Sequence, residues 1–393
     1  MSAGRIVGLT LALLAVLVAG LWIGGHPASM PPQLRDVFVD DAGGLVVEAS
    51  ELIEGNYFRE VSEEELADGS LQGMVRDLRR SNRDRFSEYF SPSMLARFNE
   101  EIEGRFSGIG LSVSGVEDGL LVVQVFKRSP AERAGIEVGD TIVSVEGKPI
   151  AGLDSNAATA RIKGPEGTEV TVGVRPRGGG DAQQLRITRA EISVPVVSSR
   201  VETVDGEKVG YARLAVFSEG AHGALRGAIE RLRRRGAEGL VLDLRGNGGG
   251  LLEEAVLTAS IFLPEGATVV TTESRSQGGA VYEAEGGNLP AQPTVVLIDR
   301  GTASAAEILA AALVDDAGAT AVGTRSFGKG VFQQEIGLSN GGALKLTVGE
   351  YFTPEGRNLA GDGIHPDVRA RDLPGTARDE ALDRALAVLA GRR

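Results

Sequence analysis

The first apolar stretch of the chain covers residues 6–23 and follows a single positive charge, Arg5. This stretch is about long enough to cross the hydrocarbon layer of a membrane as a helix. Because positive charge favours the cytoplasmic side, we expect the residues after it to lie outside the cytoplasm. Two alternatives are open for residues 1–29, a cleaved signal peptide and an uncleaved anchor, and we favour the anchor.

Residues 30–104 are rich in charge, and their apolar residues recur at helical spacing. The pattern predicts helices near residues 45–53, 68–83 and 92–103. The last of these begins at Ser91-Pro92, and an aromatic cluster, FSEYF, precedes it. We interpret the region as a small helical cap, with an arm for dimerisation as the alternative.

Short β-like runs dominate residues 105–190 and predict a small barrel-like domain. A single helix interrupts them at residues 155–162, with Asp154 or Ser155 as its cap and Gly164 as its end. The runs lie at residues 110–113, 120–125, 141–145 and 170–174.

Strands and helices alternate over residues 191–373, which predicts an α/β core with a largely buried sheet. An amphipathic helix then follows within residues 374–393. The expected strands of the core are 209–214, 239–244, 294–298, 319–322 and 344–348, and the expected helices are 220–235, 251–262 and 304–315.

Composition narrows the chemistry that this core can perform. The net charge of −13, from 41 basic and 54 acidic residues without basic clusters, disfavours a nucleic-acid partner. The absence of cysteine excludes disulfides, thiol catalysis and cysteine-based zinc sites. The three histidines, His26, His222 and His365, disfavour a histidine-rich metal site, and we expect no cofactor. A Ser–His–Asp triad lacks a convincing histidine.

A glycine loop, GNGGG, follows the predicted strand 239–244. Its four glycines let backbone N–H groups approach a ligand closely and point one way. Phosphate binding is the rival interpretation, but the loop lacks the lysine of a P-loop and the G-x-G-x-x-G spacing. It also lacks the GDSGG order of trypsin-like enzymes.

Ser304 lies in the segment DRGTASAAEI, where a loop from a strand enters a helix among small residues. The small neighbours leave room for a carbonyl group at its hydroxyl. The next N–H group, that of Ala305, belongs to a helix N-terminus, where developing negative charge is favoured. The alternative is that Thr302 or Ser304 only caps the helix. We expect Asp315, further along this helix, to serve as a cap or in an ion pair.

Lys329 stands between two glycines in the segment RSFGKGVFQ and is one of six lysines among 41 basic residues. Arginine cannot act as a base, whereas lysine can where apolar surroundings disfavour its charged form. Gln333, four residues on, could orient the amine by a hydrogen bond. The alternative is a solvated surface lysine.

Residues 105–190 resemble a PDZ domain of the bacterial protease type. The matching segments are FSGIGL, SPAERAGI and VGDTIVSVEGKPI. The turn of Gly108, Ile109, Gly110 and Leu111 offers N–H groups to a chain-terminal carboxylate, and a peptide can add beside it as a β-strand. The helix 155–162 forms the other wall of the groove in this interpretation. Lys163 at its end either adds positive charge there or is simply solvated.

Taken together, the glycine loop and the segments of Ser304 and Lys329 resemble the C-terminal processing peptidases, a serine peptidase family with a Ser–Lys pair. The resemblance covers residues 105–370 in the family's order, and GDGIHPD at 361–367 is similar to its closing motif. It implies a crotonase-like α/β core preceded by a PDZ domain. Ser304 becomes the nucleophile, Lys329 the general base and Gln333 the residue that orients the lysine.

The resemblance also implies an oxyanion hole made by the N–H groups of Ala305 and of the Gly249/Gly250 loop. The expected function is an extracytoplasmic endopeptidase that cleaves proteins near their C-termini, with PDZ movement coupling tail binding to cleavage. A membrane-tethered, non-catalytic PDZ scaffold and acyl transfer on a small thioester are the alternatives. The sequence does not identify the substrate. It also does not decide whether an adaptor lipoprotein delivers the substrate, or whether the chain assembles into a dimer or ring.

Overall fold

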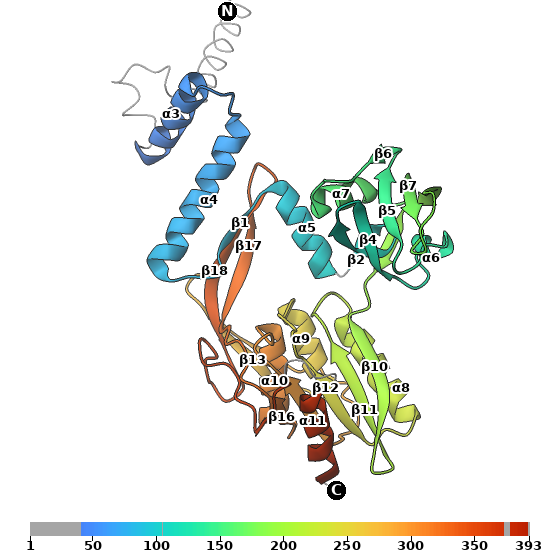
Figure 1. Cartoon of the computed structure of the whole chain (residues 1–393). Helices are drawn as coiled ribbons and strands as arrows, with labels where there is room; N and C mark the ends of the chain where they lie inside the picture. Colours follow the sequence, from blue (N-terminus) through green and yellow to red (C-terminus); the bar gives the residue numbers. More distant parts are fainter. Residues whose placement is uncertain (1–40, 104, 373–377, 392–393) are drawn as a thin grey trace, which may run out of the picture. The chain divides into compact units, whose positions relative to one another are not determined.

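The computed structural model describes residues 41–103, 105–372 and 378–391 (Figure 1). These residues form two compact units. One unit contains the residues up to Ser91 together with Ala343–Lys345, and the other contains the rest of the chain. The predicted leader at residues 6–23 lies outside the described residues. Within the described ranges, no helix has both the length and the apolar character needed to span a membrane.

The N-terminal unit contains α3 (Asp41–Asn56), α4 (Glu63–Asn82) and β1 (Glu88–Phe90). The helix α4 starts earlier than the sequence predicts, because Ser62 and Glu65 form a reciprocal capping box. The aromatic cluster is not a simple linker, since β1 pairs antiparallel with Ala343–Lys345, a segment distant in sequence. The next helix, α5 (Pro92–Glu103), has the predicted bounds.

The barrel-like domain contains one main sheet in the order β3-β4-β5-β7-β8, with β6 beside β5. The first and last strands of the domain, β2 and β9, form a separate antiparallel pair. Asp154 caps α7, because its Oδ2 accepts the N–H of Ala157 at 3.3 Å. The elements are β2 (Arg105–Gly108), β3 (Leu111–Val116), β4 (Gly119–Val125), α6 (Pro130–Arg133), β5 (Thr141–Val145), β6 (Lys148–Pro149), α7 (Ser155–Ile162), β7 (Glu169–Arg175), β8 (Gln183–Thr188) and β9 (Ala190–Ser193).

The α/β core has a six-stranded sheet in the order β10-β11-β12-β15-β16-β19. Only β10 and β11 pair antiparallel, and each later pair in this order is parallel. The strands are β10 (Val197–Val204), β11 (Glu207–Leu214), β12 (Gly239–Asp243), β15 (Thr294–Ile298), β16 (Thr320–Gly323) and β19 (Val368–Arg369). The helices are α8 (Ala221–Arg234), α9 (Leu252–Ala259), α10 (Ala305–Asp315) and α11 (Glu380–Gly391) (Figure 1).

The central strands are buried on both faces, as their continuous apolar runs predict. Leu240 and Leu242 of β12 belong to the core cluster that contains α8, α9 and α10. Val241, between them, belongs to the cluster of α11. Alternate side chains therefore face opposite helix layers, as the two-residue period of a strand requires.

A second sheet has the order β1-β18-β13-β14, with β17 also paired to β18. The predicted strand 344–348 is the middle of the longer β18, and the other strands of this sheet were not predicted. The strands are β13 (Thr268–Ser274), β14 (Gly278–Glu283), β17 (Val331–Gly337) and β18 (Ala343–Phe352). The strand β17 begins two residues after Lys329. The segment that contains this lysine therefore runs directly into the second sheet.

Candidate active site

The three segments with predicted chemistry meet at one edge of the core sheet. They follow β12, β15 and β16, which run parallel, so their carboxyl ends lie side by side. The N–H of Phe327 donates to the carbonyl of Thr302 at 2.9 Å. The N–H of Ala303 donates to the carbonyl of Asn247, also at 2.9 Å. Backbone hydrogen bonds thus join the serine segment to both of its partners.

Ser304 immediately precedes α10 and has an unusual backbone, with φ 58° and ψ −122°. Positive φ is rare for a residue other than glycine, and such strain concentrates at functional sites. Ser304 does occupy the cap position, but an ordinary N-cap has an extended backbone with negative φ. Ala305 is the first residue of the helix, so its N–H belongs to the helix N-terminus, where negative charge is favoured.

Glu307 joins the serine segment to the lysine segment, and the sequence analysis gave it no role. Its side chain is fully buried. Its Oε2 accepts the N–H of Ser304 and the N–H of Lys329, each at 2.9 Å. Its Oε1 accepts the N–H of Gly328 at 2.7 Å and the hydroxyl of Ser326. One carboxylate therefore satisfies four donors from two loops.

The closing motif at residues 361–367 is bound to the same cluster. The hydroxyl of Ser326, which donates to Glu307, accepts the N–H of Ile364 at 2.7 Å. The N–H of Gly361 donates to the carbonyl of Gly328 at 3.0 Å. The motif thus supports the backbone of the lysine segment.

The glycine loop lies against Ser304. A Cβ on Gly249 would lie 2.9 Å from Ser304 Cβ and 3.1 Å from Ala305 N, and the φ of Gly249 is 103°. The N–H of Gly249 donates to Asn247 Oδ1 at 2.9 Å within the loop. The bridge between Phe217 and Gly250 uses the carbonyl of Gly249 and the N–H of Leu251. Gly249 N–H therefore has an acceptor here, and its role in an oxyanion hole stays a prediction, as do those of Gly250 and Ala305.

Lys329 is half-buried, and its backbone N–H is fixed by Glu307. Gln333 lies on β17, where its Nε2 donates to Thr347 Oγ1 of β18 at 3.3 Å. This bond holds the amide against the neighbouring strand. The roles of Lys329 as base and of Gln333 as the residue that orients it stay predictions.

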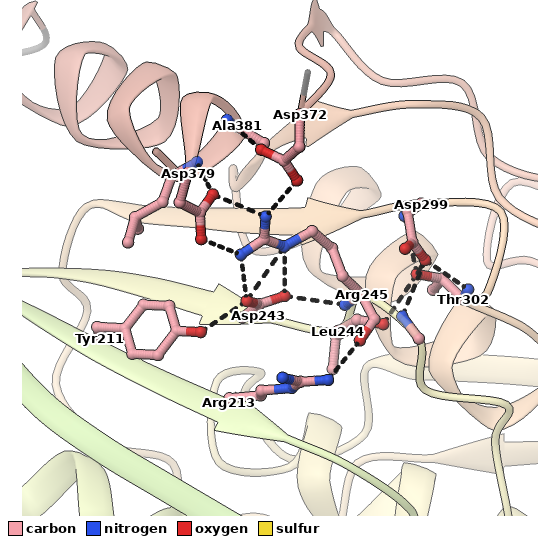
Figure 2. A network of polar contacts seen from close by, with 12 residues as sticks. Tyr211, Arg213, Asp243, Leu244, Arg245, Asp299, Thr302, Asp372, Asp379 and Ala381 are labelled. Carbon is pink, nitrogen blue, oxygen red and sulfur yellow. Dashed lines mark hydrogen bonds and ion pairs between the residues drawn. The ribbon is translucent and has the colours of Figure 1, made fainter. Parts of the chain in front are cut away.

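Figure 2 shows that Arg245, which directly precedes the glycine loop, is the centre of a charged cluster. Its guanidinium binds Asp243 at 2.7 Å, Asp379 at 2.8 Å and Asp372 at 3.1 Å. Burial opposes the charge of Arg245, but hydrogen bonds to Asp379 and Asp243 outweigh it and raise its pKa. Tyr211 donates to Asp243 at 2.7 Å. Burial and this carboxylate raise the pKa of Tyr211 to about 12.

The Arg245 cluster connects α11 to the site, because Asp379 also accepts the N–H of Leu382 at 2.8 Å in the first turn of the helix. A neighbouring carboxylate, Asp299, holds the start of the glycine loop, next to Arg245 (Figure 2). Its Oδ1 accepts the N–H of Gly246 at 2.9 Å and that of Thr302 at 3.1 Å. Arg245 and Asp299 were not predicted, because the contacts that join them to the site region, with Asp372, Asp379 and Gly246, are distant in the chain.

The remaining candidates have partners outside the serine site. His222 contacts Glu254 at 2.9 Å, and His365 contacts Asp362 at 3.0 Å. Asp315 forms the expected ion pair, with Arg357 at 2.8 Å. Across the described ranges, no cluster of three or more His, Asp or Glu side chains could hold a metal ion.

A cavity of about 320 Å³ lies between β3 and α7, where the sequence predicts the peptide groove. The strand β3 is at one end of its sheet, so its outer edge is placed to pair with an added strand. Lys163 is only half-buried, but it is not simply solvated, because it pairs with Glu100 and lies over the ring of Phe106. The groove is lined by Phe106, Gly108, Ile109, Gly110, Leu111, Ser112, Val113, Phe126, Ile142, Thr159, Ile162 and Lys163.

The fold and the site define a serine peptidase that carries a peptide-binding module. Comparison with known proteins agrees: a PDZ-domain model matches residues 107–188, and the model of peptidase family S41 matches residues 208–370. The carboxy-terminal processing proteases CtpA and CtpB of Bacillus subtilis are 36% and 35% identical to the chain. These matches cover 85% and 84% of this chain and 70% and 68% of the two relatives.

A solved structure assigned to the S41 proteases of Bacteroides fragilis has a TM-score of 0.51 and 19% identity. The alignment covers 88% of this chain and 97% of the solved chain, which shows that the two share a fold. From the sequence relatives, the chain belongs to the carboxy-terminal processing proteases of peptidase family S41, which are serine peptidases.

Proposed function

We propose that the protein is an extracytoplasmic endopeptidase that cleaves proteins near their C-termini, with Ser304 as nucleophile and Lys329 as general base. The main support is the strained backbone of Ser304 at the start of α10, held on the same carboxylate as Lys329. The family supplies the reaction class, acyl transfer from a peptide to water.

In the proposed reaction, neutral Lys329 takes the proton of the Ser304 hydroxyl as Oγ attacks the scissile carbonyl carbon. The carbonyl oxygen becomes an oxyanion, and backbone N–H groups of Ala305 and the glycine loop stabilise it. Lys329 then gives its proton to the leaving amine, and an acyl-enzyme remains. Water, deprotonated by the same lysine, attacks the ester and releases the second product and the Ser304 hydroxyl.

We further propose that the groove between β3 and α7 selects the substrate tail. Its apolar lining suits an apolar terminal side chain, and the turn at Gly108–Leu111 suits a terminal carboxylate. Movement of this domain on tail binding would then couple recognition to cleavage. A peptide with a free apolar C-terminus should be cleaved at lower KM than the same peptide with a terminal amide or aspartate.

The catalytic assignment can be tested with a fluorophosphonate probe and with casein as a general protein substrate. The unaltered protein should label at Ser304 and cleave, and Ser304→Ala should do neither. Lys329→Arg keeps the positive charge but cannot act as a base, so it should also be inactive. Lys148→Arg, on the exposed strand β6 of the PDZ domain, is the matched control and should be fully active. Cleavage by Lys329→Arg would reject the lysine as base, and an unlabelled wild type would favour the non-catalytic scaffold.

The location is a separate proposal, carried by the apolar run at residues 6–23 and the positive charge before it. Fractionation of cells should place the chain with the membrane, accessible to protease added outside the cytoplasm. Recovery of the full-length chain in the cytosol would reject this part alone. The exposed apolar residues of α3, such as Leu45 and Leu52, also favour assembly into an oligomer, which light scattering would test.

A further inference from the structure

Tyr351 connects the second sheet to the catalytic segments. It lies on β18, opposite Thr272 of β13, and its side chain is only 2% exposed. Its N–H donates to the carbonyl of Gly330, the residue after Lys329, at 3.1 Å. Its ring packs in the same core cluster as Ala305 and the rest of α10. The position of Tyr351 is therefore fixed from both the serine side and the lysine side.

The hydroxyl of Tyr351 is buried without a hydrogen-bond partner of good geometry among the described residues. A buried hydroxyl is costly when unpaired, and native proteins nearly always provide a partner or a function for such a group. A phenylalanine at this position would fill the same space as the ring of Tyr351. The presence of the oxygen at this position therefore calls for a role.

Two polar groups lie close enough to act on this hydroxyl, the carboxylate of Glu307 and the hydroxyl of Ser304. Burial, and then the charge of Glu307, raise the pKa of Tyr351, while the Ser304 hydroxyl lowers it by a smaller amount. Tyr351 thus keeps its proton near neutral pH and can donate it in a hydrogen bond. Both oxygens of Glu307 already accept two hydrogen bonds each. Ser304 Oγ is the acceptor that remains.

We propose that Tyr351 Oη donates a hydrogen bond to Ser304 Oγ and thereby directs the Ser304 proton towards Lys329. A serine hydroxyl accepts through its lone pairs while it donates its own proton, so both bonds can exist together. As Lys329 removes that proton, negative charge grows on Oγ and the bond from Tyr351 strengthens. Tyr351 retains its proton throughout. The inference rests on the proposed function, since it assigns a third residue to the same nucleophile.

Tyr351→Phe is the direct test, because it removes one oxygen and leaves the ring. The rate of fluorophosphonate labelling at Ser304 should fall by about tenfold, the loss expected for one hydrogen bond. The kcat for casein peptides should fall with it, while KM and the melting temperature stay at the wild-type values. Thr320→Val is the matched control, because Thr320 also buries an unpaired hydroxyl but lies at the opposite end of β16 from the site. It should label at the wild-type rate.

A second variant separates hydrogen bonding from packing. Replacing Tyr351 by 4-aminophenylalanine keeps a weaker donor at the same place, so the labelling rate should recover in part. Wild-type labelling by Tyr351→Phe would overturn the inference, and so would a loss that the amino variant does not reduce. Absence of labelling in the wild type would instead reject Ser304 as nucleophile, so the two failures are distinguishable.

Discussion

Ser304 and Lys329 donate their backbone N–H groups to the same oxygen, Glu307 Oε2, at 2.9 Å each. The two nitrogens therefore lie within twice that distance of each other. This relationship fixes the backbones of Ser304 and Lys329 as one unit, whatever contact their side chains make. A buried carboxylate can hold both because its four donors replace the water that it loses.

Glu307→Gln should weaken both the fold and the site. The amide presents an NH₂ group to two of the four donors, which leaves buried N–H groups unpaired at a cost of about 1–3 kcal/mol. We expect a lower melting temperature and a fall of about a hundredfold in the rate of labelling at Ser304. Glu253→Gln, an exposed residue of the first turn of α9, is the control and should change neither. Full activity in Glu307→Gln would show that the shared carboxylate is dispensable.

Gly249→Ala should inactivate the enzyme, whereas Gly248→Ala should not. A Cβ on Gly249 would enter within 2.9 Å of Ser304 Cβ on a backbone with φ 103°. Gly248 has no atom within 4 Å of an added Cβ and no positive φ. Casein cleavage and probe labelling measure the difference between two neighbouring glycines. Equal activity of the two variants would contradict the close approach of the loop to Ser304.

Because of Asp379, we expect the folded protein to lose stability as the pH becomes acidic. Its hydrogen bond to Arg245 lowers the pKa of this carboxyl in the folded protein, against the resistance of burial. Its contribution is therefore present above the ordinary pKa of about 4 and is lost as the pH falls through the depressed value. Asp379→Asn should thus destabilise at pH 7 by less than about 1 kcal/mol, since the side chain is partly exposed. Chemical unfolding should show that the difference in free energy of unfolding between variant and wild type shrinks at acidic pH. A difference that stays constant with pH would refute this prediction.

Lys163→Gln should affect recognition of the tail rather than chemistry. Lys163 lines the groove, and in its proposed role the positive charge, shared with Glu100, attracts a terminal carboxylate. We expect KM for a peptide with a free C-terminus to rise by about two- to fivefold, with kcat unchanged. The same peptide with a terminal amide should show no change, and neither should Lys148→Gln. An equal rise in KM for both peptides would assign Lys163 to packing against Phe106.

The sequence predicts the centre of the core well, because β12 and β15 are continuous apolar runs bounded by polar residues or glycine. It fails for β13 and β14, whose mixture of threonine, serine and glycine has no clear period. It also fails for β1, whose partner at Ala343–Lys345 is far along the chain. Strands at sheet margins depend on such distant pairing, which local patterns do not encode.

The site shows the same division. Ser304 and Lys329 stand out in the sequence by residue type and by their small neighbours, and the structure brings their segments together. Glu307 carried a usable signal, since Ser304 and Glu307 have the S-x-x-E spacing of a capping box. Arg245 and Tyr351 carried none, because Asp372 and Asp379 around Arg245, and the α10 residues that pack with Tyr351, are distant in the chain.

The Arg245 cluster also has a consequence for biosynthesis. The ribosome makes the glycine loop before it makes Asp372 and Asp379, which supply two of the three carboxylates around Arg245. A nascent chain therefore has Asp243 as the sole partner among these three until Asp372 and Asp379 are made. The glycine loop beside Ser304 therefore lacks two of its charged supports until Asp379 has been made.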